Sequence, residues 1–208
     1  MATHDPSSEK PTLRRLARAR RDAVPAAERA AAAAAAAALI DARVLAPLPL
    51  GATVALYAAM RSELSSEALA AAAIARGLVI AYPRAVADHT LQFHRAAPAD
   101  LAPGRFGIPE PALDAPAIAL DELAVIVVPG LLFDRGGYRL GWGGGWYDGT
   151  LARTSALRVG LAFEHQLVDE LPRAAHDQPV DLVATEIAVH PGARGRVDRA
   201  ADGAKDRR

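Results

Sequence analysis

A glycine-rich stretch at residues 133–151, FDRGGYRLGWGGGWYDGTL, holds the residues best suited to binding a charged ligand. It follows an apolar run, and GWGGG at residues 141–145 places four glycines in five positions. Glycine has no Cβ, so such backbone can adopt positive φ and press its N–H groups against a ligand. Successive N–H groups in that geometry form a concave anion site, and a helix beginning near residue 145 would add its own unpaired N–H groups. The stretch therefore predicts a phosphate cradle.

Two known phosphate loops do not fit this stretch. The dinucleotide fingerprint G-x-G-x-x-G needs glycine where Trp146 stands. The P-loop ends in Gly-Lys-Ser/Thr, and no lysine occurs between Lys10 and Lys205. Phosphate charge must therefore meet arginine, a metal ion or a residue distant in sequence. The alternative interpretation is a glycine-rich turn that is covered by two tryptophans and binds nothing.

A row of cations lies on the helix predicted at residues 10–23. Its apolar side chains share one face at helical spacing. The adjacent stripe consists of Lys10, Arg14, Arg18 and Arg21. Such a stripe is usually a solvated basic face. The functional interpretation is an arm that lays cations over a polyanionic ligand.

Strand-like and helix-like segments alternate along the chain. Strands are expected at residues 53–57, 78–82, 123–128, 157–163 and 182–185, with weaker candidates at 91–94 and 187–190. Helices are expected at residues 10–23 and 26–45, from the serines after residue 61 to residue 76, and at 145–153, with a short helix or turn at 164–171. Pro83 is expected to end the second strand. The alternation predicts a single α/β domain with three α/β/α layers and a mainly parallel sheet.

The domain is expected to span residues 9–192, between disordered tails at 1–8 and 193–208. Residues 101–112 are crowded with glycine and proline, and this excursion is long enough to form a lid or pocket wall.

Composition excludes several classes of protein. The formal net charge is +0, whereas a bulk electrostatic nucleic-acid binder is usually basic. The absence of cysteine excludes disulfides, zinc-thiolate sites and cysteine nucleophiles. The N-terminal segment lacks the apolar core of a signal peptide, and the longest low-polarity run is too short to span a bilayer. We expect a cytoplasmic protein with no nucleic-acid or membrane partner, and a monomer.

Four blocks of residues together resemble the 5-formyltetrahydrofolate cyclo-ligases, also called methenyltetrahydrofolate synthetases. The resemblance covers residues 10–186. The blocks are Lys10-x-x-Leu13-Arg14; Glu63 after the first strand; Gly104-x-x-Gly107-Ile-Pro-Glu-Pro111; and the run from Pro129-Gly130 to Tyr147-Asp148. A closing HD…VD…TE block follows at residues 176–186. The long glycine-containing block is the most specific of these.

The resemblance implies an ATP- and magnesium-dependent ring closure. It converts 5-formyltetrahydrofolate to 5,10-methenyltetrahydrofolate and releases ADP and phosphate. Transfer of the γ-phosphoryl group to the formyl oxygen makes an iminophosphate, the folate nitrogen at position 10 attacks the activated carbon, and phosphate leaves. No protein nucleophile is needed, so the protein must align its substrates and neutralise the moving phosphoryl group.

Site residues follow from the resemblance position by position. ATP is expected to contact Lys10, Arg14, Arg139, Leu140, Gly141, Trp142, Gly143, Gly144, Gly145, Trp146 and Tyr147. The folate is expected to contact Arg14, Ala58, Glu63, Trp142, Gly143, Gly144, Gly145 and Trp146, with the Glu63 carboxylate accepting N–H groups of the pterin. Mg²⁺ is expected on Asp148 and Asp181, because carboxylate oxygens beside phosphate suit that ion.

The chain departs from the family pattern at two positions. Trp146 stands where the family often has tyrosine, and Gly144 stands where a basic residue can occur. Two rival functions stay open at this point. One is a non-catalytic paralogue that binds folate or nucleotide. The other is an isomerase or deaminase acting on sugar phosphates, whose general base would come from His89, His94, His165 or His176.

Overall fold

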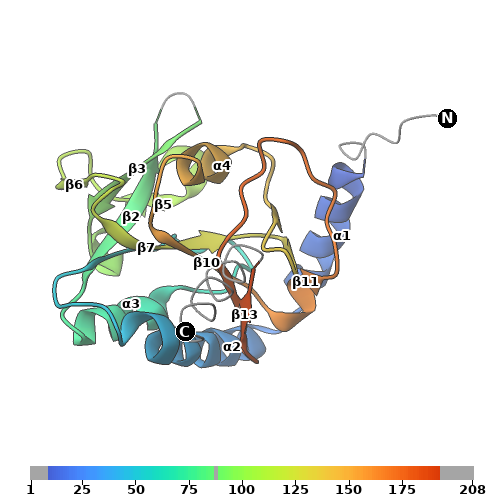
Figure 1. The fold of residues 1–208 in the computed structure, drawn as a ribbon, viewed down its shortest axis with the longest axis horizontal. Coiled ribbons are helices and arrows are strands. Elements are labelled where there is room, and N and C mark those ends of the chain that lie inside the picture. Colours follow the sequence, from blue (N-terminus) through green and yellow to red (C-terminus); the bar gives the residue numbers. More distant parts are fainter. Residues whose placement is uncertain (1–8, 87–88, 193–208) are drawn as a thin grey trace, which may run out of the picture.

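The computed structural model describes residues 9–86 and 89–192, so the tails predicted at 1–8 and 193–208 lie outside the described residues. Within these residues, eight strands form one sheet in the spatial order β13-β12-β10-β7-β1-β2-β3-β6 (Figure 1). The strands are β1 (Thr53–Ala55), β2 (Val79–Ala85), β3 (Leu91–Arg95), β6 (Ala117–Ile118), β7 (Leu123–Pro129), β10 (Leu157–Leu161), β12 (Leu182–Ala184) and β13 (Val189–Pro191). Strands β2, β1, β7, β10 and β12 are mutually parallel, and the edge strands pair antiparallel. The predicted α/β fold with a mainly parallel sheet is confirmed.

The central strand β7 contributes to a core on each face of the sheet. Val125 and Val127 belong to one hydrophobic cluster, whereas Ile126 and Val128 belong to the other. Successive side chains of a strand point to opposite faces, so one strand can fill both cores. All four residues are fully buried. This is why the strand is an uninterrupted apolar run in the sequence.

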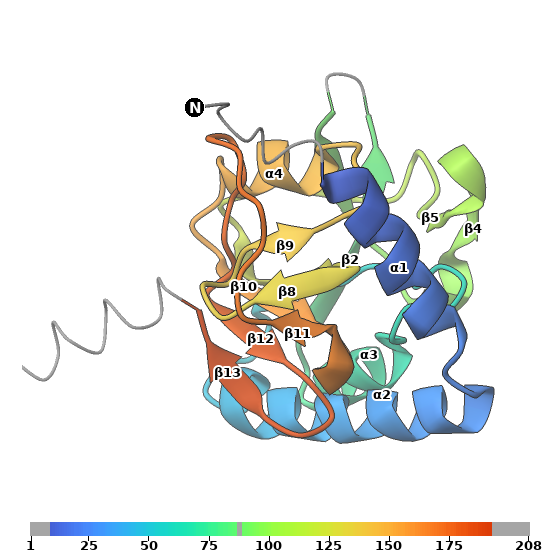
Figure 2. The same cartoon turned by 90° about the vertical axis from the view of Figure 1, so that its right-hand side faces the viewer.

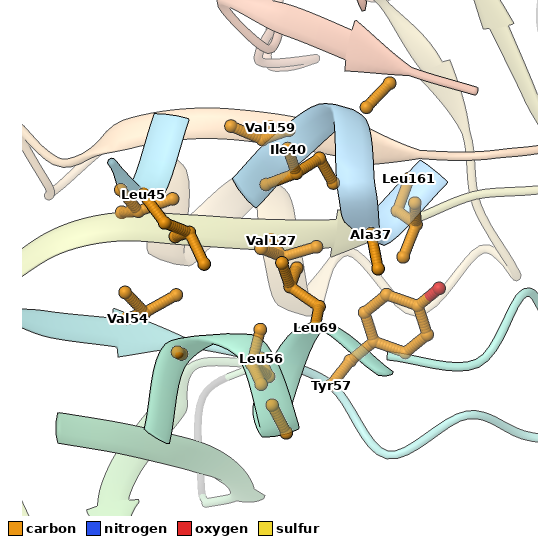
Figure 3. Packing of buried hydrophobic residues seen from close by; sticks show 14 of the residues in the cluster. Ala37, Ile40, Leu45, Val54, Leu56, Tyr57, Leu69, Val127, Val159 and Leu161 are labelled. Atoms are coloured by element: carbon orange, nitrogen blue, oxygen red, sulfur yellow. The ribbon is translucent and has the colours of Figure 1, made fainter. Parts of the chain in front are cut away.

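One face of the sheet is covered by two helices. Helix α2 (Ala26–Ile40) changes to a π-helical turn at Asp41–Leu45, and α3 (Glu67–Ala75) packs beside it (Figures 1 and 2). Ala36 and Ala73 are fully buried, and their small side chains allow the helices to approach closely. Figure 3 shows Ile40 and Leu45 among side chains of the sheet. The helix predicted over residues 26–45 is therefore present, with a change of winding near its end.

The opposite face is covered partly by a second, smaller sheet that the sequence analysis did not predict. This sheet has the order β11-β8-β9 and is made of β8 (Leu132–Asp134), β9 (Arg139–Leu140) and β11 (Leu167–Val168). Phe133 of β8 packs in the same cluster as Leu151 of the short helix α4 (Trp146–Leu151). Helices do flank the main sheet, but the second outer layer is part helix and part sheet.

Asp134 fixes the hairpin between β8 and β9. Its carboxylate is fully buried, and Oδ1 accepts the backbone N–H groups of Gly136 and Tyr138 at 2.8 and 3.0 Å. Oδ2 accepts the N–H of Leu171 and faces Arg173, both at 3.2 Å. A buried carboxylate is tolerated when it is bonded in this way. The hairpin sets the direction in which β9 enters the glycine stretch.

Pro83 lies inside β2 instead of ending it, so that prediction was wrong. The backbone of Ala81 faces β1, because its carbonyl accepts the N–H of Leu56 at 2.9 Å. Pro83 faces the same side two residues later, beyond the last register pair of β1, Ala55 with Ala81. The missing N–H of proline therefore falls where β1 offers no partner, while β2 continues against β3.

Helix α1 (Lys10–Asp22) begins with Pro11 in its first turn and runs past the small sheet (Figure 2). The glycine- and proline-rich excursion contains the short antiparallel strands β4 (Ala102–Pro103) and β5 (Pro109–Glu110) around a 3₁₀ turn at Arg105–Gly107. Further 3₁₀ turns lie at Pro98–Asp100 and Glu164–Gln166. In the described part of the chain, no single helix is long and apolar enough to cross a membrane. The segments Lys10–Asp22 and Ala26–Leu45 pass that test only together, as a pair bent by 100°.

Gly160 in β10 lies directly against a buried ring. A Cβ at this position would stand 2.5 Å from Cε1 of Phe133. We predict that Gly160→Ala destabilises the fold by about 1–3 kcal/mol through overpacking. The melting temperature should fall by roughly 2–4 °C per kcal/mol. In Gly160→Ala/Phe133→Leu the loss should be smaller than the sum of the two single effects, because leucine leaves room for the methyl group. Additive losses measured by calorimetry would contradict this packing argument.

Candidate active site

A cavity of about 930 Å³ opens at the carboxyl end of the parallel strands. Its wall includes Tyr57 and Ala58 just after β1, Pro83 in β2 and Pro129 at the end of β7. Ligands of open α/β sheets bind at this edge. The excursion contributes residues 107–110 to the wall, as predicted for a pocket wall.

The glycine loop, residues 141–145, joins β9 to α4 and lines this cavity. Gly143 and Gly145 have φ of +99° and +70°, a region that a side chain rarely adopts. Gly144 is not among the positive-φ residues, but a Cβ there would lie 2.6 Å from Cδ1 of Trp146. The loop therefore needs glycine for two reasons, backbone conformation at Gly143 and Gly145 and space for the indole at Gly144.

Most of the basic stripe on α1 is not a solvated face. Lys10 Nζ lies 2.7 Å from Asp177 Oδ2, and Arg14 Nε donates to the carbonyl oxygen of Gly141 at 2.9 Å. Arg21 is only 1% exposed. Lys10 and Arg14 both line the cavity. Three of the four stripe cations therefore contact other parts of the protein, whereas Arg18 is exposed and its Nε lies 3.9 Å from Asp22 Oδ2.

Glu63 is buried at the cavity wall and is held by three groups. Oε1 accepts the indole N–H of Trp142 at 3.0 Å, and Oε2 accepts the backbone N–H of Met60 at 2.9 Å. Arg21 Nη1 lies 3.7 Å from Oε1. Burial lowers the pKa of Arg21, and the charge of Glu63 opposes that shift. The carboxylate and the guanidinium therefore offset each other's loss of solvent.

Arg139 forms a second buried ion pair. Its Nη2 lies 3.0 Å from Asp148 Oδ1, and its Nη1 donates to the carbonyl oxygen of Gln178 at 3.0 Å. Its guanidinium also lies 5.8 Å from the ring centre of Tyr147. Burial lowers the pKa of Arg139, and Asp148 is the main opposing charge. Burial also raises the pKa of the Tyr147 hydroxyl, so this tyrosine is neutral at physiological pH.

The cavity gathers all but one of the residues that the sequence predicted for a site. The predicted residues that line it are Lys10, Arg14, Ala58, Glu63, Arg139, Leu140, Gly141, Trp142, Gly143, Gly144, Gly145, Trp146, Tyr147 and Asp148. Asp181 is not among the lining residues. Its Oδ2 accepts the backbone N–H of Arg158 at 2.8 Å.

Comparison with known proteins identifies the relatives of this chain. Residues 6–186 match the 5-formyltetrahydrofolate cyclo-ligase family. The chain belongs to this family. The 5-formyltetrahydrofolate cyclo-ligase of Mycolicibacterium smegmatis is 36% identical over 143 residues, which cover 65% of this chain and 74% of the relative. That of Escherichia coli is 33% identical over 147 residues, covering 67% of this chain and 80% of the relative.

Solved structures agree with this membership. The 5,10-methenyltetrahydrofolate synthetase of Aquifex aeolicus superimposes with a TM-score of 0.76 at 31% identity, covering 88% of this chain and 92% of that one. The synthetase of Mycoplasma pneumoniae has a TM-score of 0.70 at 20% identity, which shows a shared fold. The cavity at the sheet edge is thus built on a cyclo-ligase fold.

Asp177 is a cavity residue of this cyclo-ligase fold that the sequence analysis did not assign. It lies four positions before Asp181 in the closing block, and its Oδ2 also accepts the N–H of Ala174 at 2.8 Å. In the described residues, no group of three or more His, Cys, Asp or Glu side chains could hold a metal ion. Any metal ion bound here would therefore take most of its ligands from outside the protein, as Mg²⁺ commonly does.

The four histidines considered for a general base are held in different ways. His94 is buried and shares a hydrogen bond of 2.7 Å with the Ala115 carbonyl, and His165 stacks on Phe163. His89 Nδ1 lies 2.8 Å from the Gly144 carbonyl oxygen. His176 lines the cavity with a side chain that is 77% exposed. His94 is buried and oriented but does not line the cavity, and His176 lines it but is largely exposed, so none of the four combines both properties of a general base.

The ion pair between Lys10 and Asp177 predicts a pH-dependent stability. Burial alone would raise the pKa of Asp177, but the bonds from Lys10 and from the Ala174 N–H outweigh it, so the pKa is lowered. A lowered pKa adds stability above the ordinary aspartate value of about 3.9 and loses it as the pH falls. Asp177→Asn should therefore destabilise the fold by about 1 kcal/mol at pH 7. The deficit should shrink as the pH is lowered from 7 to values below the ordinary aspartate pKa of about 3.9.

Urea unfolding at both pH values measures this difference. Asp169→Asn is the matched control, because Asp169 pairs with Arg135 across solvent, with side chains 92% and 72% exposed. Exposed pairs contribute little. A deficit for Asp177→Asn that is the same at both pH values would exclude the ion pair as its cause.

Proposed function

We propose that this chain is a 5-formyltetrahydrofolate cyclo-ligase, which converts 5-formyltetrahydrofolate to 5,10-methenyltetrahydrofolate and turns ATP into ADP and phosphate. Membership of the family supports the conversion. The observation that carries the proposal is one cavity lined by the glycine loop, by cations of α1 and by Glu63. Groups that can donate hydrogen bonds to phosphate, and a carboxylate that can accept them from folate, thus line one cavity that is large enough for two substrates.

The phosphate half of the proposed site lies where α1 meets the glycine loop. Lys10 and Arg14 line the cavity from α1, and Arg139 lines it from β9. Residues 140–147 also line the cavity and would contribute backbone N–H groups and the two indoles. These cations and N–H groups would bind and orient the triphosphate and neutralise charge on the transferred phosphoryl group.

The folate half of the proposed site is centred on Glu63. An ionised carboxylate accepts hydrogen bonds, and a pterin presents N–H donors along one edge of its ring. Ala58 and residues 142–146 complete the proposed wall around the ring and its formyl group. The pterin and the γ-phosphate would then meet in one cavity, where alignment alone contributes much of the rate.

The reaction as proposed needs no protein nucleophile. Phosphoryl transfer to the formyl oxygen makes a good leaving group, and the folate's own amine closes the ring. The chain must hold the two substrates in line and exclude water from the activated carbon. All proposed contacts come from one chain, so a monomer suffices.

We further propose that Mg²⁺ accompanies ATP and that Asp148 is a ligand. Bound beside the phosphates, the ion would neutralise charge that builds up during transfer. Asp148 lines the cavity, and its Oδ1 is shared by Arg139 and by the N–H of Gln178 at 3.1 Å. Asp181, the second ligand that the family resemblance implies, would have to leave the Arg158 N–H to reach the same ion.

The two rival functions have less support. A non-catalytic paralogue would lack phosphate and metal residues, yet Lys10, Arg14 and Asp148 all line the cavity. A sugar-phosphate isomerase would need an oriented general base, and the four histidines offer none of that kind. ATP-dependent ring closure fits the lining residues better than either.

The decisive test is the reaction itself. Purified protein with 5-formyltetrahydrofolate, ATP and Mg²⁺ should produce the conjugated methenyl product, followed by its absorbance, with one ADP formed per product. Folate binding without ADP formation would favour the paralogue. ATP-independent turnover of a sugar phosphate would favour the isomerase.

Asp148→Asn tests the metal proposal separately. The substitution should raise the Mg²⁺ concentration needed for half-maximal ATP binding roughly tenfold or more, because a charged ligand is lost. It should also lower the melting temperature, because the Arg139 side chain, 4% exposed, loses its carboxylate partner.

Calorimetric titration of ATP at several Mg²⁺ concentrations separates these two effects. Asp181→Asn serves as the parallel variant and reports whether the second carboxylate turns toward the ion. If Asp148→Asn lowers the melting temperature but leaves the Mg²⁺ requirement unchanged, Asp148 only pairs with Arg139.

A further inference from the structure

Arg21 and Glu63 form a buried donor–acceptor pair beside the cavity. Arg21 reaches Glu63 from α1, with Nη1 3.7 Å from Oε1, and its Nε donates to Ser62 Oγ at 3.1 Å. Ser62 Oγ in turn donates to Asp22, so the guanidinium is fixed on both sides. The side chain of Arg21 is 1% exposed and that of Glu63 is 5% exposed. Both groups are therefore held in place before any ligand arrives.

One nitrogen of the Arg21 guanidinium has no hydrogen-bond partner among the described residues. This nitrogen, Nη2, is buried. A buried cationic donor without a partner is unfavourable, and such groups in native proteins call for an explanation. The free N–H of Arg21 Nη2 lies next to the carboxylate of Glu63. This arrangement suits a ligand that has a hydrogen-bond acceptor directly beside an N–H donor.

Trp142 covers this pair with a flat ring. Its indole N–H donates to Glu63 Oε1 at 3.0 Å, and its ring lies 5.6 Å from Cζ of Arg21 and 5.7 Å from Cζ of Arg61. Indole has one N–H donor and no acceptor, so it bonds to the carboxylate but leaves Nη2 of Arg21 unmet. Trp142 is still 40% exposed and belongs to the glycine loop, so it can move without disturbing the core.

A pterin matches the pair better than indole does. Its pyrimidine edge places a carbonyl oxygen at C4 directly beside the N3–H and the 2-amino group. The carboxylate can accept the N–H donors, while the guanidinium donates to the neighbouring carbonyl. The indole of Trp142 thus stands in for the heterocycle, with its donor but without its acceptor.

We propose that Arg21 is a specificity-determining residue that donates from Nη2 to the C4 carbonyl of the pterin, and that Trp142 occupies the Arg21–Glu63 pair until folate displaces it. This inference rests on the proposed function, because it assumes a folate substrate. It adds Arg21 to the folate site and gives Trp142 the role of a competitor for Glu63. Since Trp142 lies in the glycine loop, folate entry would also release that loop to close on the phosphates.

Trp142→Phe tests the displacement. Phenylalanine keeps an aromatic ring over the arginines but has no N–H to hold Glu63. Calorimetric titration with 5-formyltetrahydrofolate in the absence of ATP should give a dissociation constant about threefold to tenfold lower than that of the wild-type protein. An unchanged or weaker affinity would overturn the displacement and leave Trp142 as a ring that stacks on the folate or packs against the loop.

Arg21→Lys tests the contact to the carbonyl. Lysine keeps a cation beside Glu63, which favours the fold, but it lacks the planar fork that presents Nη2. The probes are 5-formyltetrahydrofolate and its analogue with an amino group in place of the C4 carbonyl. The wild-type preference for the carbonyl compound should fall roughly tenfold in Arg21→Lys. The exposed Arg20→Lys on the same helix is the control and should keep the full preference.

The outcomes separate this inference from the proposed function. If the protein closes 5-formyltetrahydrofolate but Arg21→Lys keeps the wild-type preference, Arg21 does not contact the carbonyl. If Arg21→Lys does not fold, the wild-type protein decides, because equal affinities for the two probes would exclude a contact between Arg21 and the carbonyl. If the wild-type protein neither binds nor converts 5-formyltetrahydrofolate, the proposed function fails first.

Discussion

The cavity depends on the pairing of buried cations with carboxylates from distant parts of the chain. Lys10 meets Asp177, Arg21 meets Glu63, and Arg139 meets Asp148. Burial alone lowers the pKa of Arg21 and of Arg139, because it disfavours the charged guanidinium. Glu63 and Asp148 offset this penalty and fix the two guanidinium groups in position before a ligand arrives. The pairs of Lys10 and Arg21 also tie α1 to the segments that carry Asp177 and Glu63, so they hold the cavity wall together.

Elements with a strong local pattern could be predicted from the sequence. The strand at β7 is an apolar run because both of its faces are buried, and α2 is almost pure alanine. Strands of only two or three residues are too short to show a comparable pattern in the sequence. The small sheet of β8, β9 and β11 depends on Asp134, whose backbone partners lie as far away as Leu171. Pro83 in β2 was misplaced because its tolerance depends on where a neighbouring strand ends.

The glycine loop and its cations could be predicted because residue types at fixed spacing carry the chemistry. The partner of each charged residue could not be predicted in this way. Arg21 belongs to the same helical stripe as Lys10 and Arg14. Only the packing of α1 shows that Arg21 is buried against Glu63. Asp177 and Asp181 are four residues apart, and only the fold shows that Asp177 faces the cavity. Tryptophan is an unusual residue in a phosphate loop, so Trp142 can be noticed in the sequence. Its hydrogen bond to Glu63 cannot be predicted, because the two residues are 79 positions apart.

The position of α1 has a consequence for how the chain matures during synthesis. This helix is translated before its partners, and the partner of Lys10 lies 167 residues later. The partners of Arg14 and Arg21 also come from later segments, Gly141 and Glu63. On the ribosome this helix is therefore made before most of the sheet. Until its partners are made, its charged side chains stay in contact with water. Its many arginines suit this delay, because a charged helix does not aggregate as an apolar one would. Docking of α1 is then a late event, and the cavity becomes complete only when nearly the whole domain has emerged.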